Sequence, residues 1–138
     1  MSKEGVEKVA MIVNSGDYDR VSYALSIAKV AGAFGMDVHM LFTYGGLSRL
    51  VKGRVDKLGS IADTYIRERL EHGLAKGTVS KLSDDISEAK KFGLKVYACV
   101  SAMGILNVTK DELIEEVDQV MGLAQFLDIS RGAMTYYI

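Results

Sequence analysis

The chain has 138 residues, of which 49% are hydrophobic and 25% are charged, with 17 basic and 18 acidic side chains. This length is enough to bury most of the apolar surface in one core without disulfides or metals. The even charge balance excludes a typical nucleic-acid binder, and the apolar runs are too short for a membrane-spanning helix.

Short apolar runs alternate with helical patterns along the whole chain. In the first half of the chain the sequence predicts a strand over 8–14, a helix over 18–34 that Gly35 ends, a strand over 37–43, a helical turn near 47–51 and an amphipathic helix over 61–74. It then predicts a helix that is capped by Ser83 and ends at Gly93, followed by a strand over 95–100. The last elements are a helix that begins with the capping box of Thr109 and Glu112, a helical segment over 121–130 and a strand over 133–138.

Strands separated by helices of this length indicate right-handed crossovers and a parallel sheet with helices on both faces. We therefore expect a single α/β domain over residues 1–138, with a sheet of four or five strands. In such sheets a ligand lies beyond the carboxyl ends of the strands. The loops at that edge are Asn14–Gly16, Thr43–Gly46 and Cys99–Gly104.

Several common chemistries lack their motifs. The turn NSGDYD is not a dinucleotide fingerprint and no phosphate loop occurs, so neither NAD nor ATP is expected, and we expect no cofactor. The two histidines, His39 in a strand and His72 on a helix, have no second metal ligand nearby in sequence, which favours packing and surface roles over a metal site. No GxSxG motif indicates a serine hydrolase.

The single cysteine, Cys99, allows two interpretations. Cysteine is among the most buried residue types, so Cys99 can be a small core residue. It also falls at the carboxyl end of a strand, where backbone amides and a following helix can stabilise a thiolate. A lone cysteine and a charged N-terminus, MSKEGVEKV, that has no secretory signal favour a cytoplasmic location.

Three stretches together resemble the DsrE/DsrF/DsrH-like proteins, especially the second DsrE-like branch: the first strand and its helix ending in AFGMDV, the segment HMLFTYGGLSRL, and KVYACVSAMGI with TKDELIEEV and GLAQFLD. The resemblance implies a flavodoxin-like sheet, frequent homo-oligomerisation, and a cysteine at position 99 that carries sulfur as a persulfide. Relatives read C-x-M-S-M-x-x-M-G after this cysteine, whereas this chain reads the shorter C-V-S-A-M-G.

On this interpretation Cys99 is the catalytic residue of a sulfur carrier or a sulfurtransferase component. Backbone amides around it hold an anionic sulfur donor, and Tyr44 replaces a tryptophan of relatives as an aromatic wall while Gly45 opens space. The expected substrate-binding residues are Ser15, Gly16, Thr43, Tyr44, Gly45, Ser101, Met103 and Gly104. Ser15 and Ser101 can equally be ordinary turn residues.

Without a second cysteine, sulfur transfer must end on a sulfur-carrier protein or a small thiol acceptor. A basic block over 49–57 and an acidic block over 111–118 are solvated faces or docking surfaces. The apolar last strand needs covering if it lies at a sheet edge, which a homo-oligomer would provide. The alternative function is a non-catalytic oligomeric module that binds a small molecule or an anion and has a structural Cys99; a flavin-binding module is a third, by fold analogy alone.

Overall fold

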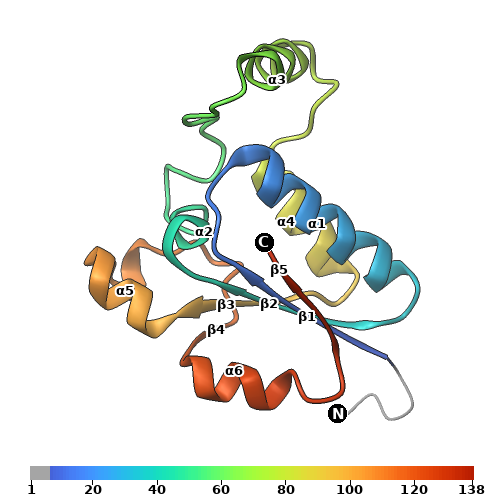
Figure 1. Ribbon diagram of the computed structural model, residues 1–138, viewed down its shortest axis with the longest axis vertical. Helices are drawn as coiled ribbons and strands as arrows, with labels where there is room; N and C mark the ends of the chain where they lie inside the picture. Colours follow the sequence, from blue (N-terminus) through green and yellow to red (C-terminus); the bar gives the residue numbers. More distant parts are fainter. Residues whose placement is uncertain (1–6) are drawn as a thin grey trace.

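Five parallel strands form one sheet in the order β4-β3-β2-β1-β5 (Figure 1). The computed structural model describes residues 7–138. The strands are β1 (Lys8–Val13), β2 (Asp37–Phe42), β3 (Lys95–Cys99), β4 (Gln119–Met121) and β5 (Met134–Tyr137). The helices are α1 (Tyr18–Ala33), α2 (Tyr44–Ser48), α3 (Thr64–Lys76), α4 (Leu82–Lys91), α5 (Val100–Leu106), α6 (Leu123–Ile129) and the 3-10 turn η1 (Lys110–Glu112).

The predicted α/β architecture with a flavodoxin-like parallel sheet is confirmed. The chain steps in one direction from β1 to β4, and β5 then returns to the free side of β1. In flavodoxin the second strand occupies that place beside the first. The last strand therefore lies at a sheet edge, as its sequence suggested.

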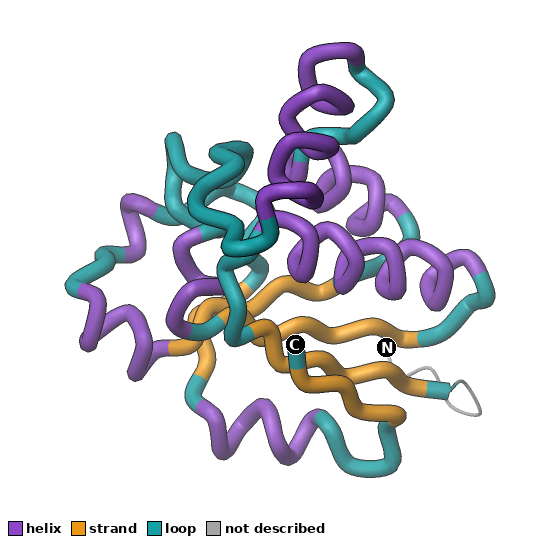
Figure 2. Tube along the Cα trace, turned by 45° about the horizontal axis from the view of Figure 1, so that its top comes forward, coloured by secondary structure: helices purple, strands orange, loops and turns teal. Residues whose placement is uncertain are grey.

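Helices cover both faces of the sheet. Figures 1 and 2 show α1 and α4 side by side over one face and α6 under the other. Successive residues of β1 face opposite sides of the sheet. Val9 lies on the α1 side, whereas Ala10 and Ile12 lie beside Phe126 of α6. Phe126 is fully buried, and each such side chain contributes about 1.5–3 kcal/mol to stability.

The segment after Thr109 differs most from its prediction. The capping box is present, with the Thr109 amide donating to Glu112 Oε1 at 2.9 Å, but it opens only the single turn η1. Leu113 then forms an antiparallel bridge with Val51, and Ile114 N donates to Leu50 O at 2.8 Å. These contacts extend the chain and lead it into β4, a strand that the sequence did not predict.

The predicted cap at Ser83 is also wrong. Helix α4 begins at Leu82 with Lys81 as its N-cap residue, two residues earlier than predicted, and Ser83 lies inside its first turn. The amide and the hydroxyl of Ser83 both donate to the Asp56 carboxylate, at 2.8 and 2.7 Å. A partner 27 residues away in the chain therefore uses the groups that a local cap would have used.

Helix α3 projects from the layered body (Figure 1), although Leu70 and Leu74 are partly buried and pack against the core. It begins at Thr64, three residues later than predicted, because the Asp63 side chain accepts a hydrogen bond from Ile66 N and so caps it. Gly73 is its one buried residue. No helix within residues 7–138 is long and apolar enough to cross a membrane.

Candidate functional site

Strand β3 ends at Cys99 and helix α5 begins at the next residue, so Cys99 is the N-cap residue of α5. The sequence predicted a loop over residues 99–104, and this is wrong because the run VSAMGIL folds as a helix. Asn107 closes the helix with a φ of 55°, and Val108 N donates back to Met103 O at 2.9 Å. The predicted site residues Ser101, Met103 and Gly104 therefore lie on a helix.

The thiol of Cys99 lies between hydroxyl groups from two segments. Cys99 is 5% exposed, and its Sγ lies 3.3 Å from Ser101 Oγ. Strand β2 runs beside β3 with Phe42 opposite Ala98, which brings Thr43 alongside Cys99. Burial raises the pKa of the Cys99 thiol, but the Ser101 hydroxyl, the amides of Ala102 and Ser101 and the Thr43 hydroxyl favour the thiolate, and the net pKa is lowered. The sequence predicted Ser101 and Thr43 as site residues, and it predicted backbone amides over 101–104, of which those of Ser101 and Ala102 contact the thiol.

The remaining predicted residues of α5 do not contribute amides to an anion site. Amides beyond the first turn of a helix donate within the helix. Met103 is buried and its side chain belongs to the core. Gly104 is exposed, with open space around its Cα. The groups of α5 that face the sulfur are therefore those of Ser101 and Ala102.

Ser15 and Gly16 lie farther from the thiol than predicted. They follow β1, and β2 separates β1 from β3, a distance of roughly 10 Å across two strand spacings. Ser15 Oγ accepts a hydrogen bond from Asp17 N at 3.1 Å, which is an ordinary turn role. The expectation that these two residues join the Cys99 site required β1 and β3 to be neighbours, and the strand order contradicts it.

The loops after β1 and β2 pack against each other through backbone atoms. A Cβ on Gly45 would lie 2.7 Å from Gly16 N, and one on Gly46 would lie 2.2 Å from Val13 O. Gly46 N donates to Asn14 O at 3.1 Å. The sequence had suggested that Gly45 opens space for a ligand. In the structure Gly45 instead allows the two loops to approach each other.

Tyr44 has a φ of 45°, a conformation that is unusual for a residue with a side chain. It is the first residue of α2, and its ring is 49% exposed. The ring is thus available at the carboxyl edge of the sheet, at the residue after Thr43. The predicted aromatic wall stays a prediction.

The carboxyl edge carries no charged side chain in four stretches, 14–16, 43–48, 99–107 and 122–127. The next residue after the second stretch, Arg49, is buried, and its guanidinium donates to backbone carbonyls. Its acceptors are Gly16 O, Arg54 O, Val55 O, Lys57 O and Leu58 O. These bonds fasten the segment over 54–58 to the loop after β1, so Arg49 has a structural role at this edge.

Part of the two charge blocks lies together in the fold. Lys52 N donates to Glu112 O at 2.8 Å, and Lys52 Nζ donates to Asp111 O at 2.9 Å. The blocks predicted as possible docking surfaces therefore meet each other where segments 51–52 and 111–113 pair.

His39 is part of a partly buried polar network with Asp37 and Tyr97. Its Nδ1 lies 2.7 Å from Tyr97 Oη, and its Nε2 lies 3.0 Å from Asp37 Oδ2. Burial, with the nearby carboxylates of Asp118 and Asp37, raises the pKa of Tyr97 to about 12. His72 is exposed on α3. Among residues 7–138, no three His, Cys, Asp or Glu side chains gather closely enough to hold a metal ion.

A comparison with models of protein families places this chain in a known family. The model of the DsrE/DsrF-like family matches residues 7–134. The chain belongs to the DsrE/DsrF-like family. The resemblance inferred from three short stretches is thus confirmed over almost the whole chain.

Proteins with a similar sequence or a similar fold occur in distant organisms. The uncharacterized protein YrkE of Bacillus subtilis is 23% identical over 158 residues, covering 98% of this chain and 99% of YrkE. The protein of unknown function MTH1491 from Methanobacterium thermoautotrophicum has a similar structure, with a TM-score of 0.68, 17% identity and coverage of 96% and 99% of the two chains. The ychN protein from E. coli has a TM-score of 0.64 at 9% identity, with coverage of 96% and 100%. At these identities the structural comparisons show the fold alone.

Proposed function

We propose that this protein holds sulfur as a persulfide on Cys99 and passes it to the thiol of a partner protein or of a small molecule. The observation that carries the proposal is the Cys99 thiol itself, which ends β3 beside two hydroxyl groups and has a lowered pKa although it is buried. A thiolate is the form that attacks sulfur. Membership of the DsrE/DsrF-like family, which is associated with sulfur relay, supports the same function.

The chemistry needs one nucleophile and two exchange steps. The Cys99 thiolate attacks the outer sulfur of a donor persulfide R–S–SH, the S–S bond of the donor breaks, and the products are Cys99–S–SH and the thiolate R–S⁻. An acceptor thiolate then attacks the outer sulfur of Cys99–S–SH, forms a new persulfide and releases the Cys99 thiolate. Each step moves one sulfur atom with its proton, so the cycle consumes no oxidant or reductant.

The uncharged carboxyl edge favours a persulfide donor over thiosulfate. A dianion is held best by cationic side chains that form charge-assisted hydrogen bonds. The stretches around Cys99 contain none, and the nearby Arg49 is engaged by backbone carbonyls. A thiol-borne persulfide places only its outer sulfur against the site, so we expect it to load Cys99 faster than thiosulfate does.

One observation favours the alternative function, a non-catalytic module that binds a small molecule and uses Cys99 as a core residue. The Cys99 side chain is only 5% exposed and packs within the main hydrophobic cluster. A structural cysteine in such a position is inert. The two functions therefore differ in whether the native thiol reacts.

The test is intact-protein mass spectrometry after incubation with a low-molecular-weight persulfide and, separately, with thiosulfate. We expect the persulfide to add the mass of one sulfur atom, removable by a reductant and absent in Cys99→Ala. A second assay measures alkylation of the native thiol at neutral pH. If neither donor gives an adduct and the thiol reacts only after unfolding, Cys99 is structural and the alternative function stands.

A further inference from the structure

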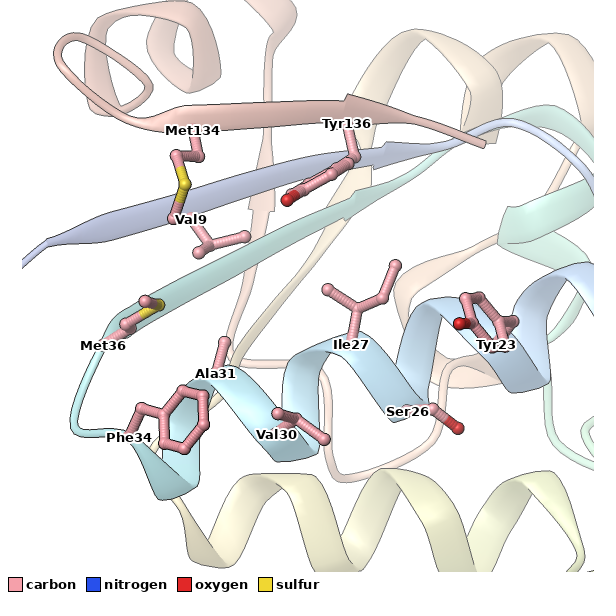
Figure 3. A pocket seen from close by; sticks show the side chains of 10 residues that line it. All are labelled: Val9, Tyr23, Ser26, Ile27, Val30, Ala31, Phe34, Met36, Met134 and Tyr136. Carbon is pink, nitrogen blue, oxygen red and sulfur yellow. The ribbon is translucent and has the colours of Figure 1, made fainter.

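One group of exposed apolar side chains lies far from the Cys99 thiol, and another lies beside it. The distant group lines a groove of about 320 Å³ between α1 and β5, where Figure 3 shows Ile27 on α1 facing Tyr136 on β5. Strands β1 and β2 separate β5 from β3, a distance of roughly 15 Å across three strand spacings. This groove therefore does not serve the thiol.

The group beside the thiol consists of the first residues of three helices. Tyr44, Val100 and Leu123 begin α2, α5 and α6, and their exposed fractions are 49%, 51% and 51%. The three helices follow β2, β3 and β4, which are neighbours in the sheet. Because neighbouring strands are about 4.8 Å apart, the three residues form a row roughly 10 Å long at the carboxyl edge. We call Tyr44, Val100 and Leu123 the apolar row.

Cys99 lies at the middle of the apolar row. Val100 is the next residue in the chain, and the Thr43 hydroxyl, one residue before Tyr44, is hydrogen-bonded to the thiol. On the other side, a Cβ on Gly122 would lie 3.9 Å from Val100 Cγ1, so the start of α6 lies against the start of α5. Cys99 itself is 5% exposed. A molecule that reaches its sulfur from the carboxyl edge must therefore contact the apolar row.

The surroundings of the apolar row carry no charge. The stretches 43–48, 99–107 and 122–127 contain no Lys, Arg, Asp or Glu. An ionic group that is moved from water against an apolar surface loses hydration and needs a partner of opposite charge to compensate. These stretches supply no such partner. The apolar row therefore favours a molecule whose group next to the sulfur is uncharged.

The size of the apolar row indicates a small molecule. An aliphatic side chain has about 100 Å² to bury and a tyrosine about 200 Å², so the half-exposed row offers on the order of 200 Å². Ile105, Leu106 and Leu127 are further exposed residues of α5 and α6, and with them the area stays below about 400 Å². Each partner of a specific protein interface buries about 800 Å². The apolar row matches a small organic group better than a protein surface.

We propose that the apolar row selects the sulfur donor of Cys99, a low-molecular-weight persulfide R–S–SH in which R is an uncharged alkyl or aryl group. The inference rests on the proposed persulfide function and names the donor class for that site. The group R contacts the apolar row while the Cys99 thiolate attacks the outer sulfur, the S–S bond of the donor breaks, and R–S⁻ leaves. A donor with a charged R loads Cys99 more slowly, because its charge is desolvated without a partner.

The test uses alkyl methanethiosulfonates, CH₃SO₂–S–R, on the full-length protein. The Cys99 thiolate attacks the sulfur that carries R, the mixed disulfide Cys99–S–S–R forms, and methanesulfinate leaves, so the reaction needs no persulfide. The groups R are methyl, propyl and pentyl, with sulfonatoethyl and trimethylammonioethyl as charged groups, and each rate is divided by that of free N-acetylcysteine. We expect the rate to rise about two- to fourfold for each methylene that the row covers. Both charged reagents should react at least about tenfold more slowly than the pentyl reagent.

Three variants test the individual side chains of the apolar row. Val100→Thr and Leu123→Asn nearly keep the size of the side chain and make it polar, and Tyr44→Asn removes the ring at a φ of 45° that asparagine tolerates. Each should lower the ratio of the pentyl rate to the methyl rate by about threefold or more. Because the ratio compares two reagents on one thiol, a change in the pKa of Cys99 cancels. The matched control is Ile105→Thr, exposed on α5 and outside the row, which keeps the wild-type ratio. Circular dichroism confirms that each variant is folded.

The donor class itself is tested with alkyl persulfides against glutathione persulfide, which carries charge, in the mass assay for Cys99. We expect the alkyl persulfides to load faster. Loading and alkylation that do not depend on R, or three variants that keep the wild-type ratio, overturn this inference and leave the persulfide function standing. A preference for alkyl reagents without any persulfide adduct overturns the function and, with it, the assigned donor. A thiol that reacts with no reagent until the protein unfolds overturns both.

Discussion

At the scale of single residues, the chemistry of the candidate site depends on how two hydroxyl groups are placed around one sulfur atom. Ser101 lies on the first turn of α5, and Thr43 follows the neighbouring strand β2. Burial raises the pKa of Cys99, and the hydrogen bonds from Ser101, from the amides of α5 and from Thr43 more than offset it. If either hydroxyl is removed, burial still raises the pKa of Cys99, but one of the hydrogen bonds that lower this pKa is lost.

Ser101→Ala and Thr43→Val should therefore raise the pKa of the Cys99 thiol. The native thiol then reaches its reactive thiolate form only at higher pH, and alkylation at neutral pH slows by up to roughly a hundredfold, since a hydrogen bond to a charged group contributes about 1.5–3 kcal/mol and about 1.4 kcal/mol is tenfold. The measurement is the rate of alkylation of the folded protein as a function of pH. We expect the whole profile to move to higher pH while its plateau is kept.

Ser130→Ala is the matched control, because the Ser130 hydroxyl donates its hydrogen bond to Phe126 O on α6 and is not one of the groups that hydrogen-bond the Cys99 thiol. Its pH profile should coincide with that of the wild type. Unchanged profiles for both Ser101→Ala and Thr43→Val would contradict the assigned electrostatics. The burial of Cys99 would then dominate its reactivity.

The sequence was sufficient to place Cys99 at the end of a strand, and Thr43 with it, because strand ends can be read from local patterns. It was not sufficient to separate Ser15 and Gly16 from the thiol. Whether β1 or β2 lies next to β3 is decided by tertiary packing, and no local pattern in the chain records it. The amides predicted over 101–104 were assigned to a loop, whereas α5 begins immediately after Cys99, so only the amides of its first turn are free to face the sulfur.

At the scale of elements, the carboxyl ends of β1 and β2 are joined by backbone contacts that only glycine permits. A Cβ on Gly46 would lie 2.2 Å from Val13 O, closer than any real contact of this kind. Backbone oxygen cannot rotate away as the end of a flexible side chain can. A side chain at position 46 therefore requires α2 to move away from β1.

Gly46→Ala should therefore destabilise the protein by about 2–3 kcal/mol, as overpacking in a tight core does. The matched control is Gly104→Ala on α5, where nothing lies within 4 Å of the added methyl group. Alanine is the better helix former, so this variant should gain about 0.5–1 kcal/mol. Urea unfolding with an unchanged slope measures both. Equal midpoints for the two variants would contradict the close approach of the loops.

Elements with a strong local pattern were predicted well, and those that depend on distant partners were not. Helix α1 and strands β1, β2 and β3 each have a continuous apolar run or face, and they form within one or two residues of the predicted bounds. The segment TKDELIEEV has a helical capping box and helical propensity, but buried Leu113 pairs with Val51 and the chain extends. Strand β4 has three residues, too few for a period to be detected.

At the scale of the whole molecule, the structure divides into a layered body and one excursion, the segment over 59–80 that carries α3 (Figure 2). The two arms of this excursion meet at its base. The Asp56 carboxylate accepts hydrogen bonds from both the amide and the hydroxyl of Ser83, and Tyr18 Oη donates to Ser80 O at 2.7 Å. The ends of the segment over 59–80 are thus held to α1 and α4 by hydrogen bonds of Tyr18, Asp56 and Ser83, which lie outside that segment.

Replacing residues 60–79 with a short Gly/Ser linker should therefore leave the body folded. Helix α3 buries only Gly73 completely, but Ile61, Leu70, Leu74 and Val79 of the deleted segment are partly buried against the core, so the loss of stability should be about 2–3 kcal/mol. Persulfide loading of Cys99 should be unchanged. The measurements are thermal unfolding and the mass assay on the same preparation. Asp56→Ala in the full chain is the informative comparison, because it removes two hydrogen bonds at the base, each contributing about 1 kcal/mol, and should cost about as much as deleting the segment. If the shortened chain loses cooperative unfolding while Asp56→Ala does not, α3 is part of the core that holds the sheet together.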